Sequence, residues 1–279
     1  MSLTIESLVG SFTLTPVGED TYTAPNAESG HAVIFGGQLL GQSIVAASLG
    51  EPDKRVKTVH TIFARAGSPD AGVEIAVERL HSGRAMASAS VSISQGPRLV
   101  TRSQVLLSAD EPDFISHADA FPSGVSGPSE GRAGGQGAWE IRTVGDADIS
   151  DPAQVGPPDL DVWIRFAGAP SDAPVLDQAL LAFATDGFLI GTAMRPHDGV
   201  GQSQAHRTLS TGVLSHTLTF HEPFSAGEWL LLSHHSTHAG HGRCYGRANV
   251  FREDGTLVAS FVQDAMIRPM AGDPGGAKL

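Results

Sequence analysis

The chain has 279 residues, of which 41% are hydrophobic and 17% charged, so it can bury a large core and lacks the charge excess of disordered chains. Its 18 basic and 30 acidic side chains give a formal net charge of −12, which disfavours nucleic-acid binding. A single cysteine excludes an intrachain disulfide and a Cys-rich metal site, and favours a reducing compartment. The N-terminal residues lack the pattern of a secretory signal, and we expect no membrane span.

The first half of the chain, residues 1–109, is predicted to contain one helix followed by a meander of strands. Residues 37–49 are apolar around most of the helical circumference, which is typical of a helix buried on several sides. Runs rich in apolar and β-branched residues then alternate with turn residues such as Ser82-Gly83. These runs predict strands at 56–64, 73–81, 85–94 and 99–108.

Residues 110–136 interrupt this pattern with prolines, glycines and five acidic side chains against one basic side chain, a composition typical of a solvated linker. A similar order of elements then returns over residues 137–269. We expect short strands at 139–144 and 161–167, a helix at 173–184, and strands at 213–221, 229–238, 243–252 and 256–267. Residues 194–210 are predicted to form a loop, and 270–279 a flexible tail.

Short sequence matches indicate that the two halves are copies of each other. His60-Thr61-Ile62 recurs as His216-Thr217-Leu218, 156 positions later, and Gly96 recurs as Gly255, 159 positions later. The shared order of a helix, four strands and a hairpin glycine supports an internal duplication.

Histidines are concentrated near the C-terminal end, with six of the twelve between positions 216 and 241. Because side chains alternate along a strand, His234 and His238 are expected to share one face and His235 the other. No carboxylate follows at matching spacing, so we expect no metal.

Other catalytic signals are weak. Cys244 lies in an apolar strand, where cysteine usually packs. Residues 127–131 match G-x-S-x-G but lie in the linker, without the strand and helix that a nucleophile elbow needs. No phosphate-binding glycine motif is present.

Three polar residues stand in apolar surroundings. Asp186 follows the helical run QALLAFAT, Thr237 follows the strand WLLLS, and Gln263 interrupts the strand LVASFV. Burial of a charge is costly unless the charge is paired or used. Taken singly, each also fits an ordinary role, as a helix-terminal acid, a strand threonine or an edge-strand glutamine.

Several longer segments together resemble one known family. FGGQLLGQSIVAAS, VHTIFARAG, WIRFAG, LLAFATDGFLIGTAM and the stretch from LSHTLTFHEPFSAGEWLLLS to GTLVASFVQDAMIR occur in the order found in the type II acyl-CoA thioesterases. The resemblance covers about residues 31–109 and 138–269. It implies an α+β double hotdog, in which each half wraps a curved antiparallel sheet around a central helix.

The resemblance also implies hydrolysis of fatty acyl-CoA by an activated water, without a cofactor. The family's water-activating Asp, Thr and Gln fall on Asp186, on Thr237 in the pair Ser236-Thr237, and on Gln263. Asp186 would be the general base, and the other two would orient the water.

The thioester oxygen needs hydrogen-bond donors as it becomes negative, and backbone N–H groups at a helix start can supply them. The candidates are the start of the second predicted helix and the residues Gly36, Gly37 and Gln38. The CoA phosphates would bind a local Arg cluster that the sequence does not identify.

Two other classes of function remain open. A hotdog enzyme of the enoyl-CoA hydratase type would need an Asp/His dyad, for which His197 is the nearest candidate. A non-catalytic acyl-CoA binding protein would have no need of the Asp/Thr/Gln set. We also expect a homo-oligomer, either a dimer or a tetramer of double-hotdog chains.

One active site per chain is expected, because alignment of the halves sets His81 opposite Thr237 and Val105 opposite Gln263. Neither first-half residue matches its counterpart. A cytoplasmic location is expected, although the C-terminal Ala277-Lys278-Leu279 approaches a peroxisomal address.

Overall fold

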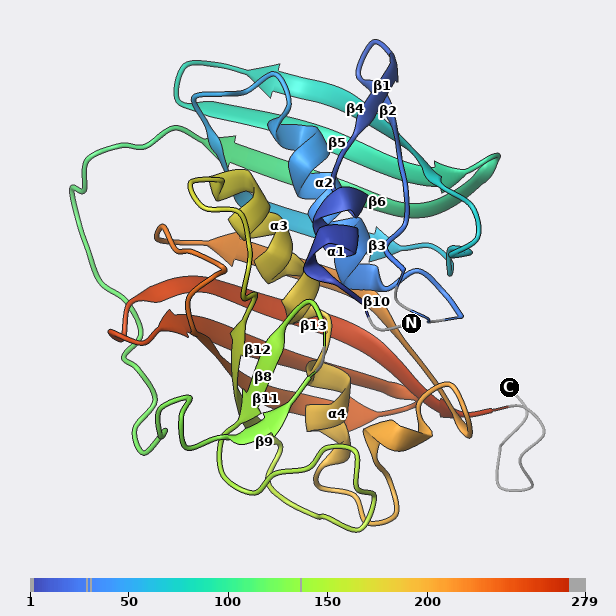
Figure 1. Ribbon diagram of the computed structural model, residues 1–279, viewed down its shortest axis with the longest axis vertical. Coiled ribbons are helices and arrows are strands. Elements are labelled where there is room, and N and C mark those ends of the chain that lie inside the picture. The colour runs from blue at the N-terminus through green and yellow to red at the C-terminus, as the bar shows by residue number, and fades with distance from the viewer. Residues whose placement is uncertain (1–2, 29, 31, 136, 271–279) are drawn as a thin grey trace.

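A computed structural model describes residues 3–28, 30, 32–135 and 137–270. Within these ranges the strands form one 13-stranded sheet in the order β1-β2-β4-β5-β6-β3-β10-β13-β12-β11-β9-β8-β7. Strands β3 and β10 pair antiparallel at its centre, so the two halves share one continuous sheet (Figure 1).

The described residues of the first half form two helices and six strands. They are α1 (Ile5–Ser11), β1 (Thr15–Gly18), β2 (Thr21–Ala24), α2 (Gly36–Ser48), β3 (Arg55–Phe63), β4 (Val73–Ser82), β5 (Met86–Gln95) and β6 (Arg98–Ser108). Helix α2 and strands β3–β6 match the predicted elements to within one residue at every end. Helix α1 and the β1–β2 hairpin are additional.

The second half repeats the main elements. It contains β7 (Arg132–Gly134), β8 (Glu140–Thr143), β9 (Asp159–Arg165), α3 (Pro174–Thr185), α4 (Leu189–Met194), the 3₁₀ turn η1 (Gln202–Gln204), β10 (Leu209–Phe220), β11 (Leu230–Gly240), β12 (Arg243–Arg252) and β13 (Leu257–Pro269). A helix followed by four antiparallel strands therefore occurs twice, which confirms the predicted α+β double hotdog.

Helices α2 and α3 pack against each other, and together with the sheet face that we call the inner face they enclose the main hydrophobic core. The backbones approach closely because Gly37 has no side chain; a Cβ there would lie 2.3 Å from the carbonyl oxygen of Phe183. One turn later a Cβ on Gly41 would lie 3.1 Å from the Ala179 oxygen. The helices are thus antiparallel, and the start of α2 lies beside the end of α3.

The matching of His60 with His216 was wrong by one residue. His216 is fully buried, whereas His60 is exposed on the opposite, outer face. Strand β3 pairs Val59 with buried Val105, as β10 pairs His216 with buried Gln263. Val59 is therefore the counterpart of His216, because a one-residue offset moves a strand side chain to the other face.

The segment 110–136 is not solvated along its whole length, contrary to the prediction. It runs from the first half down to the second (Figure 1). The Phe121 ring packs on Trp163 and Phe251, at centroid distances of 6.2 and 5.5 Å, and the Trp163 indole N–H donates to the Ser126 carbonyl oxygen at 2.9 Å. The apolar outer face of β9, β11 and β12 explains this contact, since it would otherwise be exposed to water.

One helical stretch in the described part of the chain, Pro174–Met194, is long and apolar enough to cross a membrane by length and composition. It comprises α3 and α4, and 72% of its most apolar window is buried inside the protein, as in a core helix. Residues 271–279 of the predicted tail, including Ala277-Lys278-Leu279, lie outside the described residues.

Candidate active site

Asp186 caps the C-terminal end of α3 and reaches across to the start of α2. Its Oδ2 accepts a hydrogen bond from the Gly37 N–H at 3.1 Å. A Cβ on Gly36 would lie 2.8 Å from the same oxygen, so a glycine is needed for the carboxylate to sit there. The close packing of α2 on α3 thus places an acid at a helix N-terminus, where the helix dipole favours negative charge.

The environment of Asp186 brings its pKa close to neutral pH. Burial raises the pKa of its carboxyl from 3.8 to about 7, while hydrogen bonds from the backbone N–H groups of Gly37 and Gly36 partly oppose this rise. A general base is most effective when its pKa lies near the working pH. The half-buried carboxylate therefore has the proton affinity needed to activate water.

Gln263 lies within hydrogen-bond reach of Asp186. It occupies the inner face of β13 and is only 1% exposed, and its Nε2 donates to Asp186 Oδ1 at 3.2 Å. The fold thus joins two of the three predicted site residues, from α3 and β13, 77 positions apart in the chain.

Thr237 lies at a β-bulge in β11. The pairing of β11 with β12 shifts between Ser236 and His238, so Thr237 is the extra residue. Its side chain is exposed, and its hydroxyl has no hydrogen-bond partner among the described residues. The structure therefore does not join Thr237 to Asp186 or Gln263 by a hydrogen bond.

Ser236 is a second hydroxyl candidate near this point. It is 7% exposed and pairs with Gly246, which in turn pairs with Gln263, so Ser236 and Gln263 share the inner face. From the sequence, Ser236 was named only as the neighbour of Thr237, and not as a candidate itself. A bulge reverses which of the following residues of a strand face inward. No residue type in this part of the sequence indicates that a bulge occurs here.

Because of the same bulge, the prediction that His234 and His238 share one face was wrong. His234 is buried on the inner face and contacts the Leu160 carbonyl oxygen at 3.0 Å, whereas His238 is exposed. His234 and His238 thus lie on different faces, because the extra residue changes the alternation. On the outer face, His235 Nδ1 lies 2.7 Å from Asp159 Oδ1. No cluster of three metal-ligating side chains forms in the described ranges.

The start of α2, where an oxyanion site was expected, contacts the Asp186 carboxylate. The Gly36 and Gly37 N–H groups bind the Asp186 carboxylate. The Gln38 side chain turns away, accepting from the Ala27 N–H at 3.0 Å and donating to Asn26 at 2.9 Å. In the structure these two N–H groups bind the Asp186 carboxylate, and an oxyanion-binding role of the α2 start stays a prediction.

Among the described residues of the first half, no equivalent of this acid-amide pair is found. The bulge in β4 falls between Arg79 and His81, so Leu80, rather than His81, is the counterpart of Thr237. Across the next two strands, the same pairing places Val105 where the second half has Gln263, as the alignment predicted. Neither side chain can bind a water through a polar atom.

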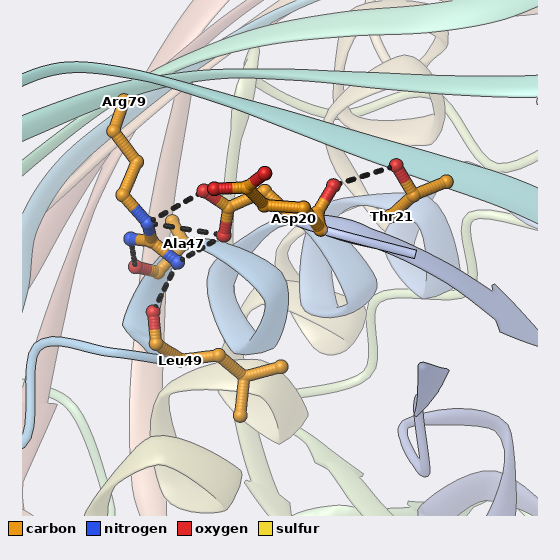
Figure 2. A network of polar contacts seen from close by, with 6 residues as sticks. Asp20, Thr21, Ala47, Leu49 and Arg79 are labelled. Atoms are coloured by element: carbon orange, nitrogen blue, oxygen red, sulfur yellow. Dashed lines mark hydrogen bonds and ion pairs between the residues drawn. The ribbon is translucent and has the colours of Figure 1, made fainter. Parts of the chain in front are cut away.

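An ion pair occupies the corresponding region at the end of α2. Arg79, the counterpart of Ser236, donates to Asp20 at 2.9–3.1 Å and to the carbonyl oxygens of Leu49 and Ala47 (Figure 2). The guanidinium thus caps the last carbonyl groups of α2, a structural role at a helix C-terminus.

The remaining candidates are poorly placed for catalysis. Burial raises the pKa of the Cys244 thiol to about 11, so the thiol stays protonated at neutral pH. His197 is exposed in the turn after α4, and in the described part of the chain it has no hydrogen bond to Asp186.

Comparisons with known proteins agree with this fold. The family "Acyl-CoA thioesterase N-terminal domain" matches residues 23–108, and "Acyl-CoA thioesterase C-terminal domain" matches residues 108–267. Human "Acyl-coenzyme A thioesterase 8" is 27% identical over 91% of this chain and 86% of its own length. "Acyl-CoA thioesterase 2" of Haemophilus influenzae is 23% identical over 96% and 99%.

Among solved structures, an acyl-CoA thioesterase II, TesB2, from Mycobacterium marinum superposes with a TM-score of 0.79 at 26% identity, covering 96% of this chain and 99% of that one. A tesB protein from Mycobacterium avium subs paratuberculosis gives a TM-score of 0.80 at 21% identity, covering 95% and 100%. With both family domains matched along nearly the whole length, the chain belongs to the type II acyl-CoA thioesterases and is an acyl-CoA thioester hydrolase.

Proposed function

We propose that this hydrolase cleaves fatty acyl-CoA by direct attack of a water molecule that Asp186 activates. The observation that carries the proposal is the carboxylate itself, held between the start of α2 and the Gln263 amide with its pKa raised to about 7. A thioester is electrophilic enough that a positioned, deprotonated water can attack it without a covalent nucleophile.

The proposed reaction balances without a cofactor. Asp186 takes one proton from water as the water oxygen bonds to the thioester carbonyl carbon. The tetrahedral intermediate then collapses, the C–S bond breaks, and the CoA thiolate leaves. The proton on Asp186 passes to the thiolate, so one acyl-CoA and one water give one fatty acid and one CoA.

Gln263 and a hydroxyl of the β11 bulge would orient the attacking water. Gln263 directs one amide hydrogen to Asp186, which favours the ionised carboxylate. We propose Thr237 as the second water ligand, as the family resemblance implies. Ser236, on the same inner face as Gln263, is the alternative that the bulge geometry supports.

Release of CoA thiol from saturated acyl-CoAs of several chain lengths tests the proposal. Asp186→Asn should abolish most of the release while acyl-CoA binding persists. Hydration of an enoyl-CoA without thiol release would support the hydratase alternative. Binding without either reaction would support a non-catalytic acyl-CoA binding protein.

We also propose that the chain forms a homo-oligomer. Ile62, Leu80 and Leu106 are 37–54% exposed on β3, β4 and β6 of the first half. In the second half, apolar outer-face residues of β9, β11 and β12 are covered by Phe121 and its neighbours. Light scattering during gel filtration would determine the mass. A cytoplasmic location remains a proposal based on the single cysteine.

A further inference from the structure

Two buried acceptor atoms belong to neighbouring residues beside the proposed base. His216 on β10 and Gln263 on β13 are cross-strand partners on the inner face, and their exposures are 0% and 1%. The His216 ring is stacked on Phe261, another β13 residue, at a centroid distance of 5.2 Å. The imidazole therefore leans toward the strand that carries Gln263.

Thr185 determines which nitrogen of His216 carries the proton. The Thr185 hydroxyl has one hydrogen, which it donates to the Ala182 carbonyl oxygen at 2.8 Å. In the hydrogen bond of 3.1 Å between the Thr185 hydroxyl and His216 Nε2, the imidazole N–H must then be the donor. This hydrogen-bond network assigns the proton to Nε2 and leaves Nδ1 as an acceptor. Burial keeps the ring neutral by lowering its pKa to about 3.

The amide of Gln263 is in a similar situation. Its Nε2 donates to Asp186, which directs Oε1 away from the carboxylate. Gln263 Oε1 and His216 Nδ1 are both buried and have no hydrogen-bond partner in the described part of the chain. An unpaired buried acceptor is costly, so native proteins satisfy such atoms, often through an internal water. A water has two hydrogens, enough for both acceptors.

We propose that His216 is a positioning residue for thioester hydrolysis, which binds a water between its Nδ1 and Gln263 Oε1 and thereby fixes the Gln263 amide. This inference rests on the proposed role of Asp186 and Gln263. The oxygen and nitrogen ends of a glutamine amide are nearly equal in shape, so hydrogen bonds must select the orientation. If the amide reversed, its oxygen would face the ionised carboxylate and oppose the charge that the base needs.

Substitutions at position 216 separate this role from packing. His216→Asn keeps an acceptor near the Nδ1 position, His216→Gln keeps a polar group only near Nε2, and His216→Phe keeps the ring against Phe261 without either nitrogen. We expect kcat to fall about tenfold in the Phe and Gln variants, with KM changed less than about twofold, and to recover largely in the Asn variant.

The pH profile gives a readout that a packing defect would not move. Loss of the Gln263 donor should raise the pKa of Asp186, so the acid limb of kcat should move to higher pH by about half a unit or more in His216→Phe. The backbone N–H groups of Gly37 and Gly36 also lower the pKa of Asp186, and its neighbour His216 is neutral. Thr61→Val is the matched control: Thr61 is the other cross-strand partner of His216, and its hydroxyl pairs with Ser103 at 2.7 Å. The acid limb should not move in this control.

A double-mutant comparison decides the outcome. His216→Phe should add no further loss of kcat when Gln263 is already Ala, because His216 acts through that amide. Additive losses, a preference for Gln over Asn at position 216, or an unmoved acid limb would each overturn the proposal. If Gln263→Ala alone leaves kcat unchanged, the proposed role of Gln263 fails instead. If His216→Phe does not fold, Thr185→Val provides the test, made both in the wild type and in Gln263→Ala. This substitution removes the hydroxyl that keeps the His216 proton on Nε2.

Discussion

Replacing the proposed base should make the enzyme both slower and more stable. In Asp186→Asn the side-chain oxygen can still accept from the Gly37 N–H, and the new amide can meet Gln263 once that amide reverses. The shape of the site is kept while the carboxyl is lost. We expect kcat to fall about 100-fold or more, as is usual when a general base is removed.

The stability gain follows from the pKa difference between the folded and unfolded chain. Below pH 3.8 Asp186 is protonated in both states and contributes nothing to the difference. As the pH rises toward 7, the unfolded chain releases a proton that the folded protein retains, so the free energy of unfolding of the wild type declines. The interval from 3.8 to about 7, at about 1.4 kcal/mol per pH unit, sets an upper bound of about 4 kcal/mol.

The expected gain is smaller than this bound, because Asp186 is only half-buried and water screens its charge. We expect Asn to stabilise the protein by about 2 kcal/mol at pH 8 and by little at pH 4. Urea titrations of both proteins at the two pH values measure the difference. A difference that does not grow between pH 4 and pH 8, or a variant less stable than the wild type at pH 8, would refute the reasoning.

Four further results are expected. In the wild type, kcat/KM should rise with pH through about 7, because the base must lose its proton; a flat profile between pH 5 and 8 would contradict this. Thr237→Val should lower kcat about tenfold or more and Ser236→Ala much less, and steady-state assays showing the reverse order would make Ser236 the water ligand. Gly37→Ala should destabilise the fold by at least about 2 kcal/mol in urea titrations, because its Cβ would meet a backbone oxygen at 2.3 Å. Leu80→Ala and Val105→Ala should leave kcat within about tenfold, and a slowly hydrolysed acyl-CoA analogue should bind one equivalent per chain; two equivalents would reveal a second site.

The helices, the long strands and the duplication could be predicted because each depends on local sequence patterns. Helix α2 is apolar on nearly every side, and it proves to be enclosed by α3, α1 and the sheet. The strands alternate between buried and exposed residues, as in β4 and β6. Asp186 and Gln263 stood out for a related reason, since a polar residue in an apolar run has to be paired or used.

Bulges and docked segments could not be predicted, because they depend on partners distant in the sequence. The bulges at Leu80 and Thr237 are defined by the neighbouring strand, and each changes which following side chains face inward. Phe121 looked like part of a polar linker until the apolar outer face of β9, β11 and β12 was known. The role of the α2 start also depended on a distant residue, Asp186.

The two halves share a β-bulge at the same place in the fold, but the side chains at this bulge differ between them. Each has a bulge in the corresponding strand, β4 or β11, and the residue before the bulge is Arg79 in one half and Ser236 in the other. Arg79 needs its Asp20 partner and the end of α2, and so it stabilises the first half. In the second half the residue at that point is a serine, and among the described residues α3 ends at Asp186 without an arginine cap. The charge of Asp186 is stabilised by the start of α2, the helix of the other half. The position of the proposed base therefore depends on α2 and α3 packing together, so neither half alone could reproduce the site.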